Sequence, residues 1–308
     1  MKKLLLLALV AALAACSAFA SAEGLSLDKL TVTYVTSPLN VPTILEKDAG
    51  VFASALGIPV EYAEITSGAD QTQALASGDV QLLYAVGGTS VILSAANGAD
   101  IKVLNMYSRA PKAFCLYAKD ETLTSPESLR GKVIAGPAGT NLHELLVAYL
   151  NTAGMTLDDV QYVSMGIPEA KAALDSGSAD AALLGGAAAY NASLQGYHLV
   201  TDGEGLIKAI IAVAVTGEFA KAHPDVIEKI TEAQKTIAKS LQDDPEAAYA
   251  LTAKALDLSE DAVREMAAAY DFSLEITEED IAGFQKTADF MAATGMIDEP
   301  YDVRALFF

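Results

Sequence analysis

One phrase occurs twice in this chain, once in each half, and it constrains the fold more than any other feature. Leu75-Ala-Ser-Gly78 leads to Gly87-Gly88, and Leu174-Asp-Ser-Gly177 leads to Gly185-Gly186. The hydrophobic pattern around each copy also recurs, as strand, loop, helix, strand, helix, strand, glycine pair and helix. We therefore expect two similar α/β lobes that can enclose a ligand between them.

The strands expected in the two halves correspond one to one. The first half predicts strands at 30–35, 60–65 and 80–86, and the second predicts strands at 132–135, 160–165 and 181–184. Strands that alternate with helices form right-handed crossovers and a mostly parallel sheet. Because sheets of this kind bind ligands beyond the carboxyl ends of their strands, the loops at those ends are the candidate site.

Length and composition agree with two lobes. The 308 residues are too many for one small core, and the hydrophobic content of 52% can fill two. The formal charge of −20 repels phosphate backbones, so we expect no nucleic-acid partner. Trp is absent, which disfavours an aromatic platform for free sugars. Metal-ligand spacings, phosphate loops and nucleophile elbows are also absent from the sequence, so we expect no cofactor and no metal.

The N-terminus has the pattern of an export signal, which we place at residues 1–22. Lys2-Lys3 precedes an apolar run from Leu4 to Ala15 that is too short to remain as a spanning helix. Leu13-Ala-Ala-Cys16 resembles a lipobox, whereas Ala20-Ser-Ala22 offers an ordinary cleavage site. We expect the lipobox to be used, with Cys16 lipidated. The protein would then be anchored in the periplasm or on the outer face of the cytoplasmic membrane.

Cys115 is the thiol that remains once Cys16 is lipidated or removed. An intrachain disulfide is then impossible, even in an oxidising compartment. Because Cys115 lies in the apolar run 113–117, we expect it to be a buried small hydrophobe.

Helix N-termini supply the strongest candidates for ligand contact. Their unpaired N–H groups and partial positive charge bind anions without Lys or Arg. The candidates at such positions are Gly139, Thr140 and Asn141 in the second half, Gly87, Gly88 and Thr89 in the first, and Gly185 and Gly186. The alternatives are that Thr140 or Asn141 only caps its helix and that the glycine pair permits tight packing of helix on strand.

Further candidates lie at other strand ends. Ser37, Pro38 and Leu39 follow the first strand, and Ser67 and Gly68 follow the second. Arg109 ends a strand where the chain should cross between lobes, so it can clamp a carboxylate or sulfonate, or equally form a hinge or surface salt bridge. We expect His143 to face solvent or to pack against its surroundings rather than to contact the ligand.

The last third of the chain reads as helical, at 218–242, 245–256, 259–270 and 278–295. We expect these helices to cover the first lobe and to turn acidic faces outward. The segment Tyr270-Asp-Phe-Ser273 can add a contact to the cleft, but its reading as a plain loop is favoured.

Four motifs, in their order and spacing, resemble a known family. They are the loop Thr36–Asn40, the stretch Glu46-Lys-Asp-Ala-Gly-Val-Phe52, the phrase Leu75–Asp79 and the turn Ser125–Lys132. Together they are similar to the periplasmic solute-binding proteins of ABC importers, in the nitrate, sulfonate and taurine branch that also includes thiamine-precursor binders. The resemblance extends from about Leu25 to the C-terminus.

This resemblance implies a type II periplasmic-binding-protein fold. Lobe 1 would comprise residues 24–108 and 213–308, and lobe 2 would comprise residues 109–212. The implied function is to capture a small molecule between the lobes, as a monomer and without chemistry, and to deliver it to an ABC permease and its ATPase. The implied ligand is a small organic anion such as a sulfonate, for example taurine, or a carboxylate, or else the inorganic anion nitrate.

The chain also departs from the family and leaves alternatives open. Many relatives carry a Trp-Asp-Pro-type motif where this chain has Leu184-Gly-Gly-Ala-Ala-Ala189, which puts the usual ligand in doubt. The alternatives are a pyrimidine or flavin-type vitamin precursor as ligand, a TRAP-type receptor, and a sensory role. A further alternative is an enzyme on the same fold, like the menaquinone-pathway dehydratases or pyrimidine synthases, with His143 as the visible catalytic candidate.

Overall fold

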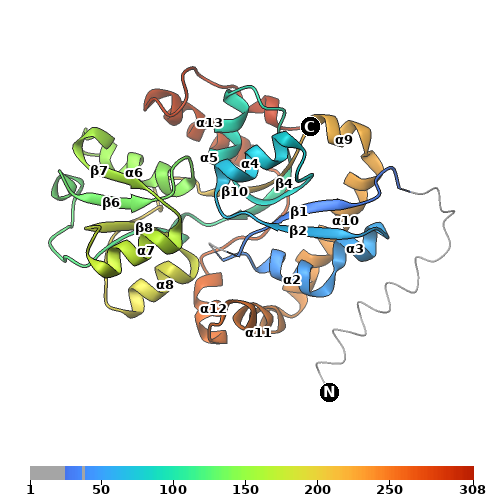
Figure 1. Ribbon diagram of the computed structural model, residues 1–308, viewed down its shortest axis with the longest axis horizontal. Helices are drawn as coiled ribbons and strands as arrows, with labels where there is room; N and C mark the ends of the chain where they lie inside the picture. Colours follow the sequence, from blue (N-terminus) through green and yellow to red (C-terminus); the bar gives the residue numbers. More distant parts are fainter. Residues whose placement is uncertain (1–24, 37–38) are drawn as a thin grey trace.

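The computed structural model describes residues 25–36 and 39–308, which form two α/β lobes side by side (Figure 1). The predicted export signal with Cys16, and the candidates Ser37 and Pro38, lie outside the described residues.

Lobe 1 contains the first four strands and a later one. The strands are β1 (Leu30–Tyr34), β2 (Val60–Glu64), β3 (Leu83–Gly87), β4 (Lys102–Arg109) and β10 (Ile210–Val215). Its helices are α2 (Val41–Ala49), α3 (Val51–Leu56), α4 (Gly68–Ser77) and α5 (Gly88–Ala96).

Lobe 2 and the C-terminal helices make up the rest. Lobe 2 has β5 (Phe114–Ala118), β6 (Val133–Gly136), β7 (Gln161–Ser164), β8 (Ala181–Gly185) and β9 (His198–Asp202), with α6 (Asn141–Asn151), α7 (Ile167–Ser176) and α8 (Gly186–Leu194). The C-terminal helices are α9 (Gly217–Ala222), α10 (Pro224–Asp243), α11 (Pro245–Leu256), α12 (Glu260–Ala267) and α13 (Glu278–Ala293).

The two sheets have the same topology, which confirms the repeat seen in the sequence. Lobe 2 has the strand order β7-β6-β8-β5-β9. Lobe 1 has the order β2-β1-β3-β10-β4, because a parallel bridge between Val32 and Leu82 joins its two ladders. In each sheet the strand in the fourth place, β10 or β5, runs antiparallel to both neighbours, and the other strands run parallel.

The repeated glycines occupy matching places in the two lobes. Gly78 ends α4 and Gly177 ends α7, with φ of 80° and 77° respectively. This left-handed conformation favours glycine over residues with a Cβ. Each glycine pair then joins a strand to a helix, at β3–α5 and at β8–α8.

Two predicted helices are wrong in their extent. The stretch expected to be helical up to Ala55 forms two helices, α2 and α3, because Gly50 between them adopts φ of 59°. The helix expected at 218–242 is also two helices, α9 and α10. Pro224 begins the second one, and a proline cannot donate the N–H that would continue the first.

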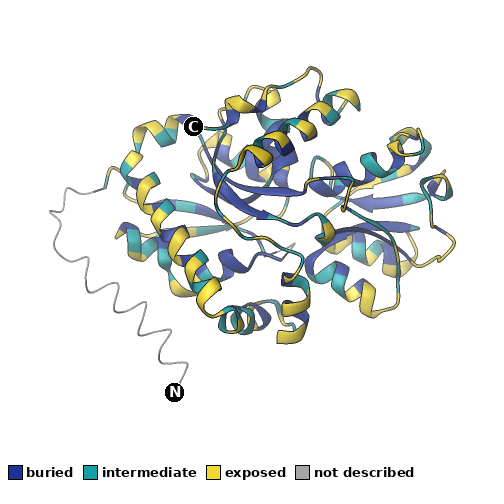
Figure 2. Cartoon of the chain, turned by 180° about the vertical axis from the view of Figure 1, so that it is seen from behind, coloured by how far each residue is buried: buried dark blue, intermediate teal, exposed yellow. Residues whose placement is uncertain are grey.

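The C-terminal helices pack on lobe 1, as predicted, with one extension. α10 lies against α2 and α3, α11 lies against α2, and α13 lies against α5. α12 also touches α8 of lobe 2, so the C-terminal region spans both lobes (Figure 1). The central strands β3, β5, β8 and β10 are buried, the edge strands β2 and β7 are partly exposed, and the helices turn exposed faces outward (Figure 2). Within the described part of the chain, no helix has the length and apolarity needed to cross a membrane.

The chain crosses between the lobes twice, at 110–113 and at 203–209. Ile210 to Ala212 belong to β10 in the lobe 1 sheet, and Arg109 pairs with Ile210 there. The crossings therefore lie close to the lobe boundaries expected at 109 and 212, which remain an interpretation.

Candidate ligand site between the lobes

The N-terminus of α5 is the first-lobe part of the candidate site. Gly87 ends β3 and precedes the helix without a capping side chain, so the first N–H groups of α5 lack an intrahelical acceptor. Thr89 and Ser90 lie in the first turn and are both buried. A Cβ on Gly88 would fit tightly, because it would lie 3.2 Å from the carbonyl oxygen of Ile210.

The loop before α6 supplies the second-lobe part. Gly139 adopts φ of 67°, and its N–H donates to Nδ1 of His143 over 3.1 Å. Thr140 is the cap of α6: its Oγ1 accepts from the N–H of His143 and donates to the carbonyl oxygen of Pro137. Thr140 thus takes the capping role that the sequence also allowed for Asn141.

Asn141 instead reaches across to lobe 1. Its Oδ1 accepts a hydrogen bond from Oγ1 of Thr89 over 2.7 Å, and its Nδ2 donates to the carbonyl oxygen of Ile210 over 3.3 Å. Only 2% of Asn141 is exposed. Ser90, in the first turn of α5, forms a second bridge between the lobes, because its Oγ donates to the carbonyl oxygen of Gly139 over 2.8 Å.

The N-terminus of α4 lies at the same place. Ser67 caps α4 by accepting from the N–H of Asp70 over 3.3 Å. A Cβ on Gly68 would lie 2.1 Å from Oγ of Ser90 and 3.9 Å from Cγ2 of Thr140. The structure therefore brings the beginnings of α4, α5 and α6 together, from both lobes.

Leu39 and the segment after α12 form a separate contact. Leu39 is buried, packs in an apolar cluster with α11 and α12, and donates its N–H to Oη of Tyr270 over 3.1 Å. Tyr270 stacks on Phe272 at 5.4 Å between ring centroids. Burial raises the pKa of Tyr270. Leu39 is thus a core residue here, and Tyr270 positions it.

Gly185 and Gly186 join β8 to α8. Because β6 and β8 run parallel, the pair lies at the same edge of the lobe 2 sheet as the loop before α6. Gly185 pairs with Phe114 of β5, and Gly186 adopts φ of 57°. Their described contacts lie within lobe 2, so the structure does not bring this pair into the group formed by α4, α5 and α6.

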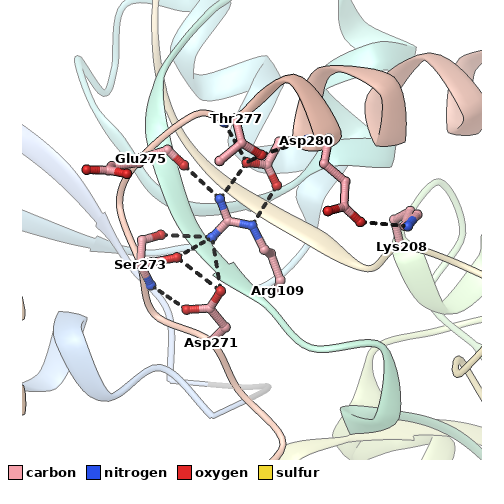
Figure 3. A network of polar contacts seen from close by, with 8 residues as sticks. Arg109, Lys208, Asp271, Ser273, Glu275, Thr277 and Asp280 are labelled. Carbon is pink, nitrogen blue, oxygen red and sulfur yellow. Dashed lines mark hydrogen bonds and ion pairs between the residues drawn. The ribbon is translucent and has the colours of Figure 1, made fainter.

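Arg109 is held by a network of polar groups on lobe 1 (Figure 3). Its Nε and Nη2 each lie 2.6 Å from a carboxylate oxygen of Asp280. Nη1 donates to Ser273, Nη2 also donates to the carbonyl oxygen of Glu275, and Asp271 lies 3.6 Å from Nη1. Of the two roles that the sequence allowed, the structure shows the salt bridge beside the hinge.

His143, the catalytic candidate, and Cys115, the predicted buried thiol, are both packed. His143 stacks on Tyr162 at 5.0 Å between centroids, and burial lowers its pKa. Cys115 is buried as predicted, and burial raises its pKa to about 12. Among residues 25–36 and 39–308, no group of three His, Cys, Asp or Glu side chains could hold a metal ion.

Glu144 is a residue that the sequence reading missed. It follows His143 on α6, is 4% exposed, and contacts two residues of lobe 1. Oε2 lies 2.6 Å from Oγ1 of Thr89, and Oε1 lies 3.0 Å from Oγ1 of Thr287 on α13. An acid inside a helix is normally exposed, and no local pattern marks this one as buried.

One hollow of about 770 Å³ lies elsewhere on lobe 1. It is lined by Asp100, Lys102, Glu218, Lys221 and the C-terminal Phe308, among others. Lys102 begins β4, so this hollow lies at the amino end of that strand and not at the strand ends where α4, α5 and α6 begin.

Comparison with solved structures defines the fold. The alkanesulfonate-binding protein SsuA from Xanthomonas axonopodis pv. citri, bound to MOPS, aligns with a TM-score of 0.83 at 21% identity, over 92% of this chain and 98% of that one. SsuA from Escherichia coli aligns with a TM-score of 0.77 at 22% identity, over 92% of both chains. The fold is therefore the two-lobed periplasmic-binding-protein fold that the sequence predicted. The desulfurization enzyme DSZB shares it at a TM-score of 0.68 and 17% identity, over 91% of this chain and 96% of that one.

Sequence comparison gives the family. A family model described as NMT1/THI5 like matches residues 37–248, and the chain belongs to this family. The taurine-binding periplasmic protein of E. coli (strain K12) is 31% identical over 70% of this chain, and the match spans 64% of that protein's length. A putative aliphatic sulfonates-binding protein of Bacillus subtilis (strain 168) is 26% identical over 85% of this chain and 81% of its own. The resemblance found in the motifs is confirmed, and the taurine-binding relative, which is named as periplasmic, supports the prediction of an exported protein.

Proposed function

We propose that this protein is an extracytoplasmic receptor that binds a small organic anion, a sulfonate such as taurine, between its two lobes. It delivers this ligand to an ABC permease and its ATPase. Ligand that contacts both lobes stabilises the closed arrangement, so binding shifts the population toward closure.

This proposal rests on one observation: the N-termini of α4, α5 and α6 lie close together. Gly68, the turn Gly87–Ser90 and the loop Gly139–Asn141 come from both lobes and lie together. The N–H groups at such helix ends carry partial positive charge and bind sulfonate or carboxylate oxygens directly. Arg109 is committed to Asp280, so the anion is held by backbone and hydroxyl donors.

The choice of a sulfonate rests on the relatives. Proteins named for taurine and for aliphatic sulfonates match this chain in sequence. Ser37 and Pro38 remain predicted contacts, and Gly185 and Gly186 are proposed only as a lobe 2 wall that a larger ligand can reach.

A binding role is supported over an enzymatic one by the state of the reactive side chains. The fold is shared with a desulfurization enzyme, so the fold alone does not decide. His143 has Nδ1 occupied by the N–H of Gly139, and Cys115 is a buried thiol with a raised pKa. Neither group is poised as a base or nucleophile.

Isothermal titration calorimetry of the purified protein tests the ligand class. We expect saturable binding of taurine and of ethanesulfonate, and weaker binding of β-alanine, the carboxylate analogue of taurine. Nitrate, pyrimidines and flavin precursors serve as competitors from the other ligand classes. Binding of a pyrimidine with no response to any sulfonate would replace the sulfonate proposal with the vitamin-precursor alternative. Taurine recovered unchanged after long incubation would exclude turnover.

Two asparagines on one helix provide a matched pair of variants. Asn141 begins α6 at the site, whereas Asn151 ends the same helix and is exposed. Asn141→Ala should weaken taurine binding by about tenfold or more, which corresponds to roughly 1.4 kcal/mol. Asn151→Ala should leave the affinity unchanged. Equal affinities for the two variants would place the ligand elsewhere.

Anchoring, assembly and partner are part of the same proposal. We propose that Cys16 is lipidated and that the exported protein is a monomer on the outer face of the membrane. Genes for an ATPase and a permease beside its own would support the ABC partner. A large integral-membrane carrier there would support the TRAP-type alternative instead.

A further inference from the structure

A buried row of polar side chains joins the lobes beside the proposed ligand site. The row runs from Asn141 on α6, through Thr89 on α5, to Glu144 on α6, and ends at Thr287 on α13. α6 belongs to lobe 2, whereas α5 and α13 lie on lobe 1. All four residues are less than 10% exposed, at 2%, 1%, 4% and 7% in that order.

The number of protons in this row is fixed by its geometry. Oγ1 of Thr89 lies 2.7 Å from Oδ1 of Asn141 and 2.6 Å from Oε2 of Glu144, and it carries a single proton. Asn141 cannot donate to Thr89, because its Nδ2 faces the carbonyl oxygen of Ile210, which only accepts. Two hydrogen bonds therefore need a second proton, and Glu144 is the group that can carry it.

We propose that Glu144 is a neutral carboxylic acid in this structure and donates to Thr89, and that the lobes take up one proton when the contact between α5 and α6 forms. In this arrangement Glu144 donates to Thr89, Thr89 donates to Asn141, and Thr287 donates to the other oxygen of Glu144. The inference concerns the contact between the lobes, and only its ligand test rests on the proposed function.

The surroundings of Glu144 favour the neutral acid. Burial raises its pKa, and this effect exceeds the opposing effect of the hydrogen-bond contacts with Thr89 and Thr287. On its own helix the neighbouring His143 has a pKa lowered by burial and so brings no positive charge. On α13, Asp280 is paired with Arg109, and Lys286 is exposed on the outer side. α5 and β10, which pack at the same place, contain no titratable residue.

Separation of the lobes would reverse this state. Both partners of the carboxyl group, Thr89 and Thr287, belong to lobe 1, so opening exposes Glu144 to water, where a glutamate has a pKa of about 4.3. Closure is then unaffected by pH below that value. It weakens as pH rises toward the pKa of the closed state, by up to about tenfold in the closing equilibrium per pH unit.

Infrared difference spectroscopy tests the protonation state without a ligand. Spectra of the wild type and of Glu144→Gln at pH 7 should differ by one carboxylic-acid carbonyl band. Gln keeps both hydrogen bonds, because its amide donates to Thr89 and accepts from Thr287. Glu228→Gln, a change at an exposed position on α10, should show no such band. If the difference spectrum between wild type and Glu144→Gln shows a carboxylate band in place of the acid band, the proposal is overturned. If the Gln variant fails to fold, spectra of Thr287→Val against wild type should show the acid carbonyl band displaced, because the carbonyl oxygen of Glu144 loses the hydrogen bond from Thr287. Absence of an acid band from both proteins would overturn the proposal.

Calorimetric titration of taurine in two buffers with different ionisation enthalpies tests the coupling. Wild type should take up close to one proton per taurine bound near pH 7, and Glu144→Gln should take up none. Binding without proton uptake would show that the contact exists in both open and closed states, and would overturn the coupling. An absence of taurine binding would count against the proposed function, while the infrared result on Glu144 would stand by itself.

Discussion

Arg109 and Asp280 form a two-point ion pair that ties the end of β4 to the first turn of α13. Nε to Oδ1 and Nη2 to Oδ2 are both 2.6 Å, and the side chains are 19% and 6% exposed. The same aspartate caps α13, because Oδ2 accepts from the N–H and the hydroxyl of Thr277. Burial raises the pKa of Asp280, but the hydrogen bonds from Arg109 and Thr277 outweigh it and the pKa is lowered.

Replacement of this arginine should therefore cost stability rather than only affinity. Arg109→Gln leaves a buried carboxylate without its cation, and we expect the free energy of unfolding to fall by about 3 kcal/mol. Arg130→Gln removes the surface pair with Asp159, where Arg130 is 60% exposed, and should cost less than about 1 kcal/mol. Urea unfolding of both variants makes the comparison. A stable Arg109→Gln protein that has lost taurine binding would restore Arg109 as a ligand residue.

A buried glutamate on α2 should make folding depend on pH. Glu46 is fully buried, and burial raises its pKa to about 7, although the N–H of Phe52 and the hydroxyl of Tyr62 donate to it. A raised carboxyl pKa stabilises the fold below the unfolded value of about 4.3, and this contribution is lost as pH rises to about 7. The wild type should lose about 3 kcal/mol of unfolding free energy from this group across that interval.

Glu46→Gln should remove this part of the pH dependence. Urea unfolding at pH 5 and pH 8 measures how the free energy of unfolding changes with pH. Glu228→Gln is the exposed control and should show the same change as the wild type. If Glu46→Gln shows the same pH dependence of the unfolding free energy as the wild type, the carboxylate of Glu46 is hydrated in the folded protein.

Gly68 should be intolerant of any side chain. A Cβ there would lie 2.1 Å from Oγ and 2.9 Å from Cβ of Ser90, and rotation of the hydroxyl would break its hydrogen bond to Gly139. We expect Gly68→Ala to destabilise the protein by about 1–3 kcal/mol. Gly87→Ala meets its nearest neighbour at 3.4 Å and is the tolerated control. Denaturation midpoints decide between them, and Ser90→Gly should partly rescue Gly68→Ala because it removes both clashing atoms.

Membrane attachment should depend on one residue of the leader. We expect Cys16→Ser to abolish incorporation of a labelled fatty acid and to move the protein from the membrane fraction to the soluble fraction. The mass of the mature N-terminus distinguishes the two cleavage sites. A wild-type chain that begins after Ala20-Ser-Ala22, without lipid, would contradict the lipobox prediction.

Local patterns were enough to predict the repeated order of strands and helices within each half and the two places where glycine pairs join them, but not the breaks between α2 and α3 and between α9 and α10. Gly78 and Gly177 end their helices by a backbone conformation that their own sequence signals. The loops before α5 and α6 were predicted for the same reason, because a strand end and a helix start are both local features.

Contacts between distant segments were not predictable in the same way. The partner of Arg109 is 171 residues further along the chain, so the sequence could not choose between a clamp and a salt bridge. Glu144 was overlooked because its burial depends on Thr89 and Thr287, which come from two other segments. Asn141 was recognised, but its reach to Ile210 follows from how the lobes meet and not from its neighbours.

The position of β10 sets an order for folding after export. Lobe 2 is continuous in the chain, whereas the lobe 1 sheet needs β10 between β3 and β4, and β10 is synthesised after all of lobe 2. Until that strand arrives, the facing edges of β3 and β4 have no partner and are open to wrong pairing. A chain that emerges N-terminus first can thus fold lobe 2 before lobe 1 is complete. The lobe 1 sheet is completed only when β10 inserts between β3 and β4, after lobe 2 has folded.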